Sequence, residues 1–342
     1  MGRTANIVGW DNGGGLSRDI DILCGVLADL GWTVTVNGRR TGGAARARFA
    51  RALGRVRRRV FKVAVASGVV SAPFGLNVHL EDINGDCLPL ARRNVLIPNQ
   101  EWFRSASFGN LSAIDEVWAK TRLAQGIFSQ LGCKARLVGW MGADQRMCEA
   151  NVPKTLTALH IAGSSLWKGT EAILDVWSEH PEWPLLRVVR RTRGYEGAEL
   201  PWRSRPPASN IQIFTERLDE ESLNQMQAES AIHLCPSEAE GFGHILLEGL
   251  SVGAIVITTD APPMNEIVGH ENGLLVCAER SEPMGLDRRY FVSRGELKKA
   301  VVRALSMSEA NRDSMGRAAR ARFEQITRSF RESLRSCLES LN

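Results

Sequence analysis

Two glutamates, Glu240 and Glu248, stand with seven residues between them in the segment that carries the densest chemistry of the chain. Gly241 and Gly243 follow the first glutamate and precede an apolar run at 245–247, which predicts the start of a helix. A helix that begins beside glycines leaves N–H groups and the positive end of its dipole at one point, which suits a phosphate or diphosphate. Carboxylates instead accept hydrogen bonds from sugar hydroxyls. A nucleotide sugar offers both kinds of group, so the segment predicts a site for one.

A strand, a loop and a helix are needed to position these groups. The apolar run 231–235 stops at Pro236, which predicts a buried parallel strand that ends in a loop. Gly253 is the expected end of the following helix. Glu248 is expected on an exposed face of that helix, where its carboxylate would meet a ligand.

The stretch PSEAEGFGHILLEG, followed by TTDAPPMNE, resembles the E-x7-E signature of retaining glycosyltransferases of the GT-B fold, family 4 type. The resemblance implies that Glu240 lies at the donor sugar as the candidate catalytic residue, and that Glu248 holds the ribose hydroxyls. It also implies that residues just after the first glutamate offer the diphosphate their backbone N–H groups. These candidate donor-binding residues are Gly241, Phe242, Gly243 and His244.

Residues 163–169 resemble the family's G-R-x-x-x-x-K-G loop, in which an arginine and a lysine clamp the diphosphate. Lys168 is present, but Ser164 stands at the arginine position, and the loop is one residue shorter. A lost charge-assisted contact could cost roughly 1.5–3 kcal/mol unless another group replaces it. Arg190, Arg191 and Arg193, after the strand predicted at 186–189, are the candidates, although a solvated charge run is the commoner role for each of them.

Two further segments complete the donor side that the resemblance implies. A βαβ opening places Gly14 and Gly15 in a glycine loop that approaches the donor phosphates. The turn that follows the strand predicted at 211–214 places Glu216 and Arg217 at the nucleobase.

Polar side chains also follow the strands predicted at 75–80 and 93–97. In doubly wound sheets, ligands gather at the carboxyl ends of strands, so the cleft is expected to be lined by His79, Glu81, Asp82, Asn99 and Gln100. Of these, His79, Asn99 and Gln100 are the candidate catalytic residues on the acceptor side. The family usually shows a His-Asp pair where this chain has IPNQEW, and Asn99 or Gln100 is the expected replacement. For His79, a buried histidine of the core is an equally good interpretation.

No cofactor and no metal are expected. The first glycine loop departs from G-x-G-x-x-G because its third position is Arg18, which disfavours a nicotinamide cofactor. Asp19 and Asp21 form a D-x-D pair, but they fall on the first turns of a helix, where acids simply favour the dipole. The seven cysteines are scattered without zinc spacing, which indicates buried thiols in a reducing compartment.

The length of 342 residues predicts two domains. The expected fold is α/β, with GT-B architecture: two Rossmann-like doubly wound domains that face each other across a cleft. The expected boundaries are 1–152 for the acceptor-side domain and 153–322 for the nucleotide-sugar domain, with a C-terminal helix at about 323–342 packing back on the first. Residues 285–290 are expected to be irregular.

The net charge of +5 conceals a local basic segment, since residues 39–62 carry ten Arg and Lys and no acid. Helical spacing of its apolar residues predicts an arginine face over 46–62. The chain shows no recognised nucleic-acid module, so no nucleic-acid partner is expected. An anionic membrane surface explains the charge better. With no apolar run of eighteen residues and no signal-peptide core, the expected location is cytoplasmic and peripheral at the inner face of the membrane.

The resulting interpretation is a retaining, metal-independent glycosyltransferase. It would move a sugar from a nucleotide-sugar donor to a glycan or lipid-linked acceptor in cell-surface polysaccharide or glycolipid biosynthesis. Two alternatives stay open: a nucleotide-sugar epimerase of the same fold, and a catalytically silent GT-B subunit, which the departures at Ser164 and IPNQEW favour.

Overall fold

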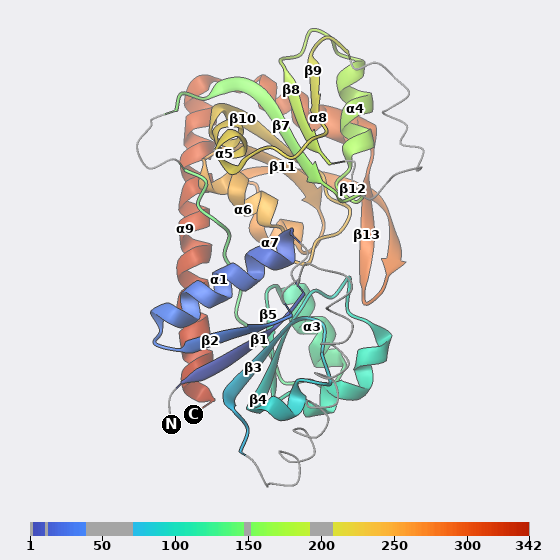
Figure 1. Ribbon diagram of the computed structural model, residues 1–342. Helices are drawn as coiled ribbons and strands as arrows, with labels where there is room; N and C mark the ends of the chain where they lie inside the picture. The colour runs from blue at the N-terminus through green and yellow to red at the C-terminus, as the bar shows by residue number, and fades with distance from the viewer. Residues whose placement is uncertain (1–2, 11–12, 39–70, 147–151, 192–207, 342) are drawn as a thin grey trace. The chain divides into compact units, whose positions relative to one another are not determined.

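The computed structural model describes residues 3–10, 13–38, 71–146, 152–191 and 208–341 (Figure 1). The basic segment predicted at 46–62 lies outside these residues. The chain divides into two compact units: unit 1 holds residues 1–140 and 329–342, and unit 2 holds residues 141–328.

The first boundary falls before the expected linker because residues 142–145 pack on unit 2. A side chain at Gly142 would lie 2.9 Å from the Cβ of Leu247, and the N–H of Gln145 donates to the hydroxyl of Ser251 at 3.0 Å. These contacts assign the segment to unit 2. Helix α9 (Glu309–Ser340) contributes to both units, with its last residues in unit 1.

Unit 1 is built on a parallel sheet with the strand order β2-β1-β3-β4-β5-β6. The order reverses between β1 and β3, because the chain leaves β1 for one neighbour and later returns to the other side. This reversal is the topological switch point of the sheet, where doubly wound folds bind ligands. The elements are β1 (Thr4–Val8), α1 (Gly15–Asp29), β2 (Thr33–Asn37), β3 (Phe74–Glu81), η1 (Leu88–Leu90), β4 (Ala91–Pro98), η2 (Ser105–Ala113), β5 (Glu116–Ala119), α3 (Arg122–Gln130) and β6 (Ala135–Leu137).

Unit 2 is built on a sheet with the order β13-β12-β11-β10-β7-β8-β9, parallel except for β13. Its order reverses between β7 and β10, which places a second switch point there. The elements are β7 (Thr155–Gly163), α4 (Thr170–Ser178), β8 (Leu186–Arg190), β9 (Ile211–Phe214), α5 (Glu220–Glu229), β10 (Ser230–Cys235), α6 (His244–Ser251), β11 (Ile255–Asp260), α7 (Met264–Ile267), β12 (Gly273–Met284), β13 (Asp287–Val292) and α8 (Arg294–Leu305).

The expectation of irregular structure at 285–290 is wrong. Strands β12 and β13 form an antiparallel hairpin in which Ser281 pairs with Tyr290. Gly285 lies in the turn with a φ of 58°, a left-handed conformation that glycine adopts without strain.

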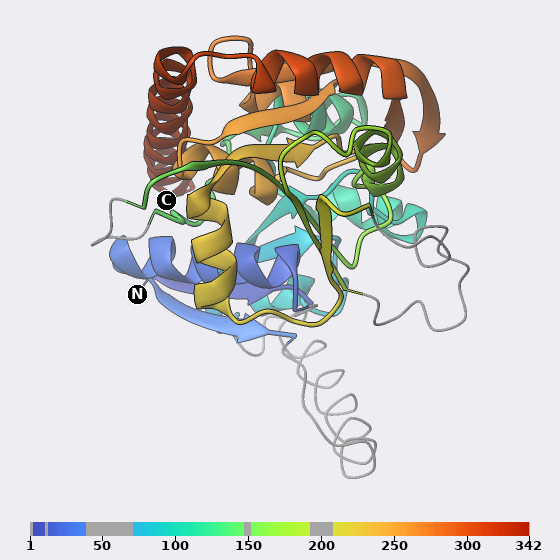
Figure 2. The same cartoon turned by 90° about the horizontal axis from the view of Figure 1, so that it is seen from above.

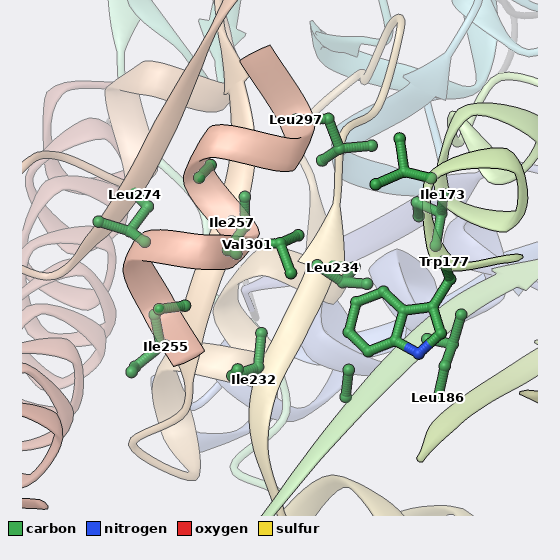
Figure 3. Close-up of a cluster of buried hydrophobic side chains, with 14 of the residues drawn as sticks. Ile173, Trp177, Leu186, Ile232, Leu234, Ile255, Ile257, Leu274, Leu297 and Val301 are labelled. Atoms are coloured by element: carbon green, nitrogen blue, oxygen red, sulfur yellow. The ribbon is translucent and has the colours of Figure 1, made fainter. Parts of the chain in front are cut away.

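The core of unit 2 lies between its sheet and the helices α4 and α8. Trp177 of α4, Val301 of α8 and strand residues such as Ile232 are all buried in one cluster (Figure 3). Seen from above, α8 and α5 lie on opposite sides of these strands (Figure 2). The central strands β10 and β11 are buried along nearly their whole length, as the apolar run at 231–235 predicts for a parallel strand covered on both faces. Among the helices of the described segments, none combines the length and apolar character that crossing a membrane requires.

Candidate functional site

Two loops meet at the switch point of unit 2, one after β7 (residues 164–169) and one after β10 (residues 236–243). The N–H of Glu238 donates to the carbonyl of Trp167 at 2.9 Å, which joins the loops. Gly169 has a φ of +68°, and a Cβ on it would lie 2.4 Å from the carbonyl oxygen of Pro236. The loops are therefore too close at this point for any residue larger than glycine.

Lys168 and Glu240 form an ion pair where these loops join. The hydroxyl of Ser237 donates to the same carboxylate oxygen at 2.7 Å. Only 18% of the Lys168 side chain and 10% of the Glu240 side chain are exposed. The structure thus brings together the cation expected at the diphosphate and the carboxylate expected at the donor sugar, and each partly offsets the other's desolvation.

The glycines after Glu240 shape the start of α6. Gly243 caps the helix with a φ of 109°, no side chain caps it, and the N–H of Leu246 turns back to the Gly243 carbonyl at 3.0 Å. Phe242 is buried and packs edge-on against the ring of His244, with centroids 5.7 Å apart, which anchors the loop. The backbone of Gly241 to His244 therefore starts a helix at the point where Lys168 and Glu240 meet.

Glu248 lies on a buried face of α6, so the expectation of an exposed face is wrong. Its exposed fraction is 1%, and the side-chain amide of Gln227 donates to its carboxylate at 2.9 Å. Helix α6 is covered on all sides, since every residue from Ile245 to Ser251 is buried. A ribose role for Glu248 stays a prediction, and it would act together with Gln227.

A neutral histidine ties the two loops to the strands beneath them. His160 bonds through Nδ1 to the carbonyl of Leu234 at 2.7 Å and through Nε2 to the hydroxyl of Thr170 at 2.8 Å. Because a carbonyl only accepts, Nδ1 carries the proton and Nε2 accepts from the threonine. Burial lowers the pKa of His160 to about 4, so the ring is uncharged at neutral pH. Together, the two hydrogen bonds of His160 fix the start of α4 relative to the end of β10.

Arg190, one of the candidates for the cation missing at Ser164, lies on the strand next to that loop. It ends β8 and pairs in register with Gly163, next to Ser164 on the neighbouring strand. Its side chain is 4% exposed and lies 3.7 Å from a carboxylate oxygen of Glu171 in the first turn of α4.

Sequence reasoning missed the part that the β12–β13 hairpin takes in the site. Arg289 forms an ion pair with Glu238, with the Nε contact at 3.1 Å, and its guanidinium lies 5.7 Å from the centre of the Trp167 ring. The N–H of Tyr290 donates to the Glu238 carbonyl at 2.7 Å. The hairpin therefore holds both loops, although no motif in the sequence signals it.

Glu216 and Arg217, the predicted nucleobase contacts, are exposed residues just before α5. That helix begins at an Asp219 cap, whose carboxylate accepts from the N–H of Ser222 at 2.7 Å.

The remaining candidates all belong to unit 1. Gly14 and Gly15 begin α1 beside the switch point. His79 is fully buried within β3, where its Nδ1 accepts from the N–H of Asn84 at 3.2 Å, and burial lowers its pKa to about 4. Gln100 is also fully buried, while Asn99 bonds to other polar side chains at the end of β4.

The two aspartates of the D-x-D pair lie in different surroundings. Asp19 is buried in an ion pair with Lys120, whereas Asp21 is exposed. Within the described ranges, no group of three or more His, Cys, Asp and Glu side chains is arranged to hold a metal ion.

One protein-family model matches part of the chain. Residues 207–320 match the family described as "Glycosyl transferases group 1". A search of curated protein sequences found no match.

Several solved structures share the fold. Sucrose-phosphate synthase from Thermosynechococcus elongatus has a TM-score of 0.71 and 14% identity, with 99% of each chain covered. HepE from Anabaena, solved with UDP and glucose, has a TM-score of 0.68 and 16% identity, covering 99% of this chain and 100% of its own. WaaG, a glycosyltransferase involved in lipopolysaccharide biosynthesis, has a TM-score of 0.64 and 15% identity, covering 97% and 98%.

These likenesses confirm the expected GT-B architecture of two Rossmann-like units. The family match includes the whole of the loop after β10 and helix α6, where the two glutamates lie. Fold and family match together support a glycosyltransferase.

Proposed function

We propose that this protein is a retaining, metal-independent glycosyltransferase whose unit 2 binds the nucleotide-sugar donor. The observation that carries the proposal is the meeting of Lys168 and Glu240 at the glycine-capped start of α6. A cation and a helix N-terminus at one point suit a diphosphate, and a carboxylate beside them suits a sugar hydroxyl.

In this mechanism the protein stabilises the leaving diphosphate with fixed charges. Lys168 and the N–H groups of residues 241–244 face the negative charge that develops as the glycosidic bond breaks, which is electrostatic preorganisation. When a diphosphate binds, Lys168 pairs with the diphosphate instead of with Glu240. The carboxylate of Glu240 can then orient the donor sugar. Glu248 and Gln227 hold the ribose hydroxyls. The acceptor is assigned to unit 1, and because WaaG acts in lipopolysaccharide biosynthesis, we propose a cell-surface polysaccharide or glycolipid as the product.

The donor assignment predicts a nucleotide-specific thermal shift. Because HepE was solved with UDP and glucose, a panel of UDP-, GDP-, ADP- and dTDP-sugars is expected to show one nucleotide class ahead, with UDP first. Ligand at a hundred times its dissociation constant adds about 2.7 kcal/mol to the free energy of unfolding. A chelator should leave the shift unchanged.

A shift that requires a divalent metal, or no shift with any nucleotide, would contradict the proposal. Product analysis separates the alternatives. Release of the nucleoside diphosphate with transfer or hydrolysis indicates a transferase, and isomerisation without release indicates an epimerase. Binding without turnover indicates a catalytically silent subunit.

We also propose that the basic segment 39–62 attaches the protein peripherally to an anionic membrane surface. At about 1 kcal/mol per basic residue near the surface, four or five engaged arginines suffice for reversible docking that salt weakens. Co-sedimentation is expected with phosphatidylserine-containing liposomes at low salt, and much less with neutral liposomes or at high salt. Changing Arg55, Arg57, Arg58 and Arg59 to glutamine should reduce pelleting at low salt, and no loss would contradict the proposal. Equal pelleting with both lipids would instead leave only a solvated arginine face.

A further inference from the structure

A buried ion pair lies at the carboxyl edge of the unit 1 sheet. The ammonium of Lys120, just after β5, is 2.5 Å from the carboxylate of Asp19 on α1, and each side chain is 2% exposed. The same ammonium donates to the side-chain oxygen of Asn99 at 2.9 Å and lies 4.9 Å from the centre of the Trp140 ring. Burying two charges costs free energy that an apolar pair would not, so the pair stabilises the fold weakly at best and calls for another explanation.

Asn99 links this ion pair to Glu81. Its amide donates to the Glu81 carboxylate at 3.2 Å. Glu81 ends β3 with a φ of 69°, and it is the one residue other than glycine with a positive φ in the described part of the chain. Such a conformation costs free energy in a residue with a Cβ and tends to persist where it aims a functional side chain. Burial raises the pKa of Glu81, with smaller opposing effects from Asn99 and Lys120.

Two exposed tryptophans follow the strands on either side of β3. Trp10 follows β1 and is 68% exposed, and Trp102 follows β4 and is 52% exposed. The N–H of Trp102 donates to the carbonyl of Asn99 at 3.0 Å, so the turn that presents this indole also presents the amide that holds Glu81. These are the largest of the exposed apolar side chains in the described ranges. Their strands flank the switch point of unit 1, where a doubly wound sheet binds its ligand.

The chemistry of this edge fits the hydroxyls and apolar ring face of a sugar. Exposed indoles offer flat apolar surfaces, and a carboxylate with an amide offers acceptors and donors beside them. A phosphate fits poorly, because Lys120 is already paired with Asp19 and Arg104 with Asp82, while Glu81 adds a further carboxyl group.

We propose that this edge of unit 1 binds a saccharide ring of the acceptor, with Glu81 and Asn99 contacting its hydroxyls and Trp102 and Trp10 contacting its apolar face. The inference rests on the proposed glycosyltransferase function and narrows it, since the acceptor then ends in a sugar rather than in a bare lipid phosphate or a protein side chain. The buried Lys120–Asp19 pair positions Asn99, and through it Glu81.

Saturation-transfer difference NMR with a mixture of neutral hexoses and hexosyl disaccharides tests the proposal. The spectra are recorded with the nucleoside diphosphate of the best donor present at saturation, so that the donor site is filled. We expect signals with the parent protein, and a loss of affinity of about tenfold or more for Trp102→Ala and for Glu81→Gln. Trp32→Ala serves as the control. Trp32 comes just before β2, so it lies at the amino ends of the strands, whereas Trp102 lies at their carboxyl ends.

Glu81→Gly separates binding from folding. Glycine adopts the positive φ of position 81 without strain, so this variant should melt at or above the parent temperature while losing the saccharide signal. A structural role alone would lower the melting temperature instead. No saccharide signal with the parent protein, or an unchanged signal in Glu81→Gly and Trp102→Ala, overturns the proposal.

Lys168→Met distinguishes failure of this inference from failure of the proposed function. It should lose the nucleotide-sugar thermal shift and keep the part of the saccharide signal that Glu81→Gly removes, since Lys168 belongs to unit 2 and Glu81 to unit 1. If the parent protein binds no nucleotide sugar yet shows a saccharide signal that depends on Glu81, the donor assignment fails and the saccharide site stands.

Discussion

Replacing Lys168 with methionine is expected to lower the rate of sugar transfer by about 10²–10³-fold, the usual cost of removing one group that stabilises developing charge. Methionine keeps most of the side-chain volume, so the loops can retain their packing. What disappears is the ammonium beside Glu240 at the start of α6. Because Ser164 stands in place of the family's arginine, Lys168 supplies a large share of the positive charge at the diphosphate. Its loss should therefore lower the rate of sugar transfer strongly.

Two further variants give this experiment its controls. Lys299→Met removes an exposed lysine of α8 in the same unit, with 75% of its side chain exposed, and should leave both activity and stability unchanged. Glu240→Gln in the Lys168→Met background removes the carboxylate left without its cation, so it should recover stability but not activity. Because Lys168 and Glu240 touch, their effects should be strongly non-additive in a double-mutant cycle. Activity within threefold of the parent in Lys168→Met would refute a diphosphate role.

Features that depend on local sequence were predicted well. The strand at 231–235, the helix that starts near 245 and the left-handed Gly253 all match the structure, because an apolar run, flanking glycines and a terminating glycine specify them locally. The doubly wound order of both sheets also matches, since alternating strands and helices leave few other topologies.

Features that depend on distant contacts were not predictable. The burial of Glu248 follows from the covering of α6 on all sides, and its partner Gln227 lies 21 residues away on another helix. The pairing of Lys168 with Glu240 spans 72 residues, and that of Lys120 with Asp19 spans 101. A single sequence does not show which distant residues contact each other. The candidate residues could therefore be predicted, but their partners could not.

The hairpin of β12 and β13 was missed for a different reason. The residues around its turn, from Glu279 to Arg289, are rich in charged side chains, which also suits an exposed loop. The contacts of β13 with Glu238 are what hold this segment as a strand, and the sequence does not reveal them. Propensity is a weak guide for such edge strands because their stability comes from neighbours.

Gly169→Ala is expected to destabilise unit 2 by about 2–5 kcal/mol, which is large for a single added methyl group. The left-handed φ of +68° accounts for about 1–2 kcal/mol. The rest comes from steric overlap, since the new Cβ would lie 2.4 Å from the Pro236 carbonyl oxygen and 3.0 Å from its ring. Overpacking of this kind typically costs about 1–3 kcal/mol because backbone must move.

Gly163→Ala is the matched control for this prediction. Gly163 also has a positive φ, of +56°, and lies in the same unit, but a Cβ added to it would have no atom of the described residues within 4 Å. Its substitution should therefore cost only the conformational part, about 1–2 kcal/mol. The difference between the two variants, measured by urea unfolding, isolates the contact between the loops.

The same pair of variants tests whether that contact shapes the donor site. Moving the Pro236 loop away from Gly169 also moves Ser237 and Glu240, which follow it directly and meet Lys168. Gly169→Ala should therefore weaken nucleotide-sugar binding well beyond any effect of Gly163→Ala, when both are assayed below their melting temperatures. Equal destabilisation of the two variants would show that the loops separate freely. Equal donor affinities would show that donor binding does not depend on their close approach.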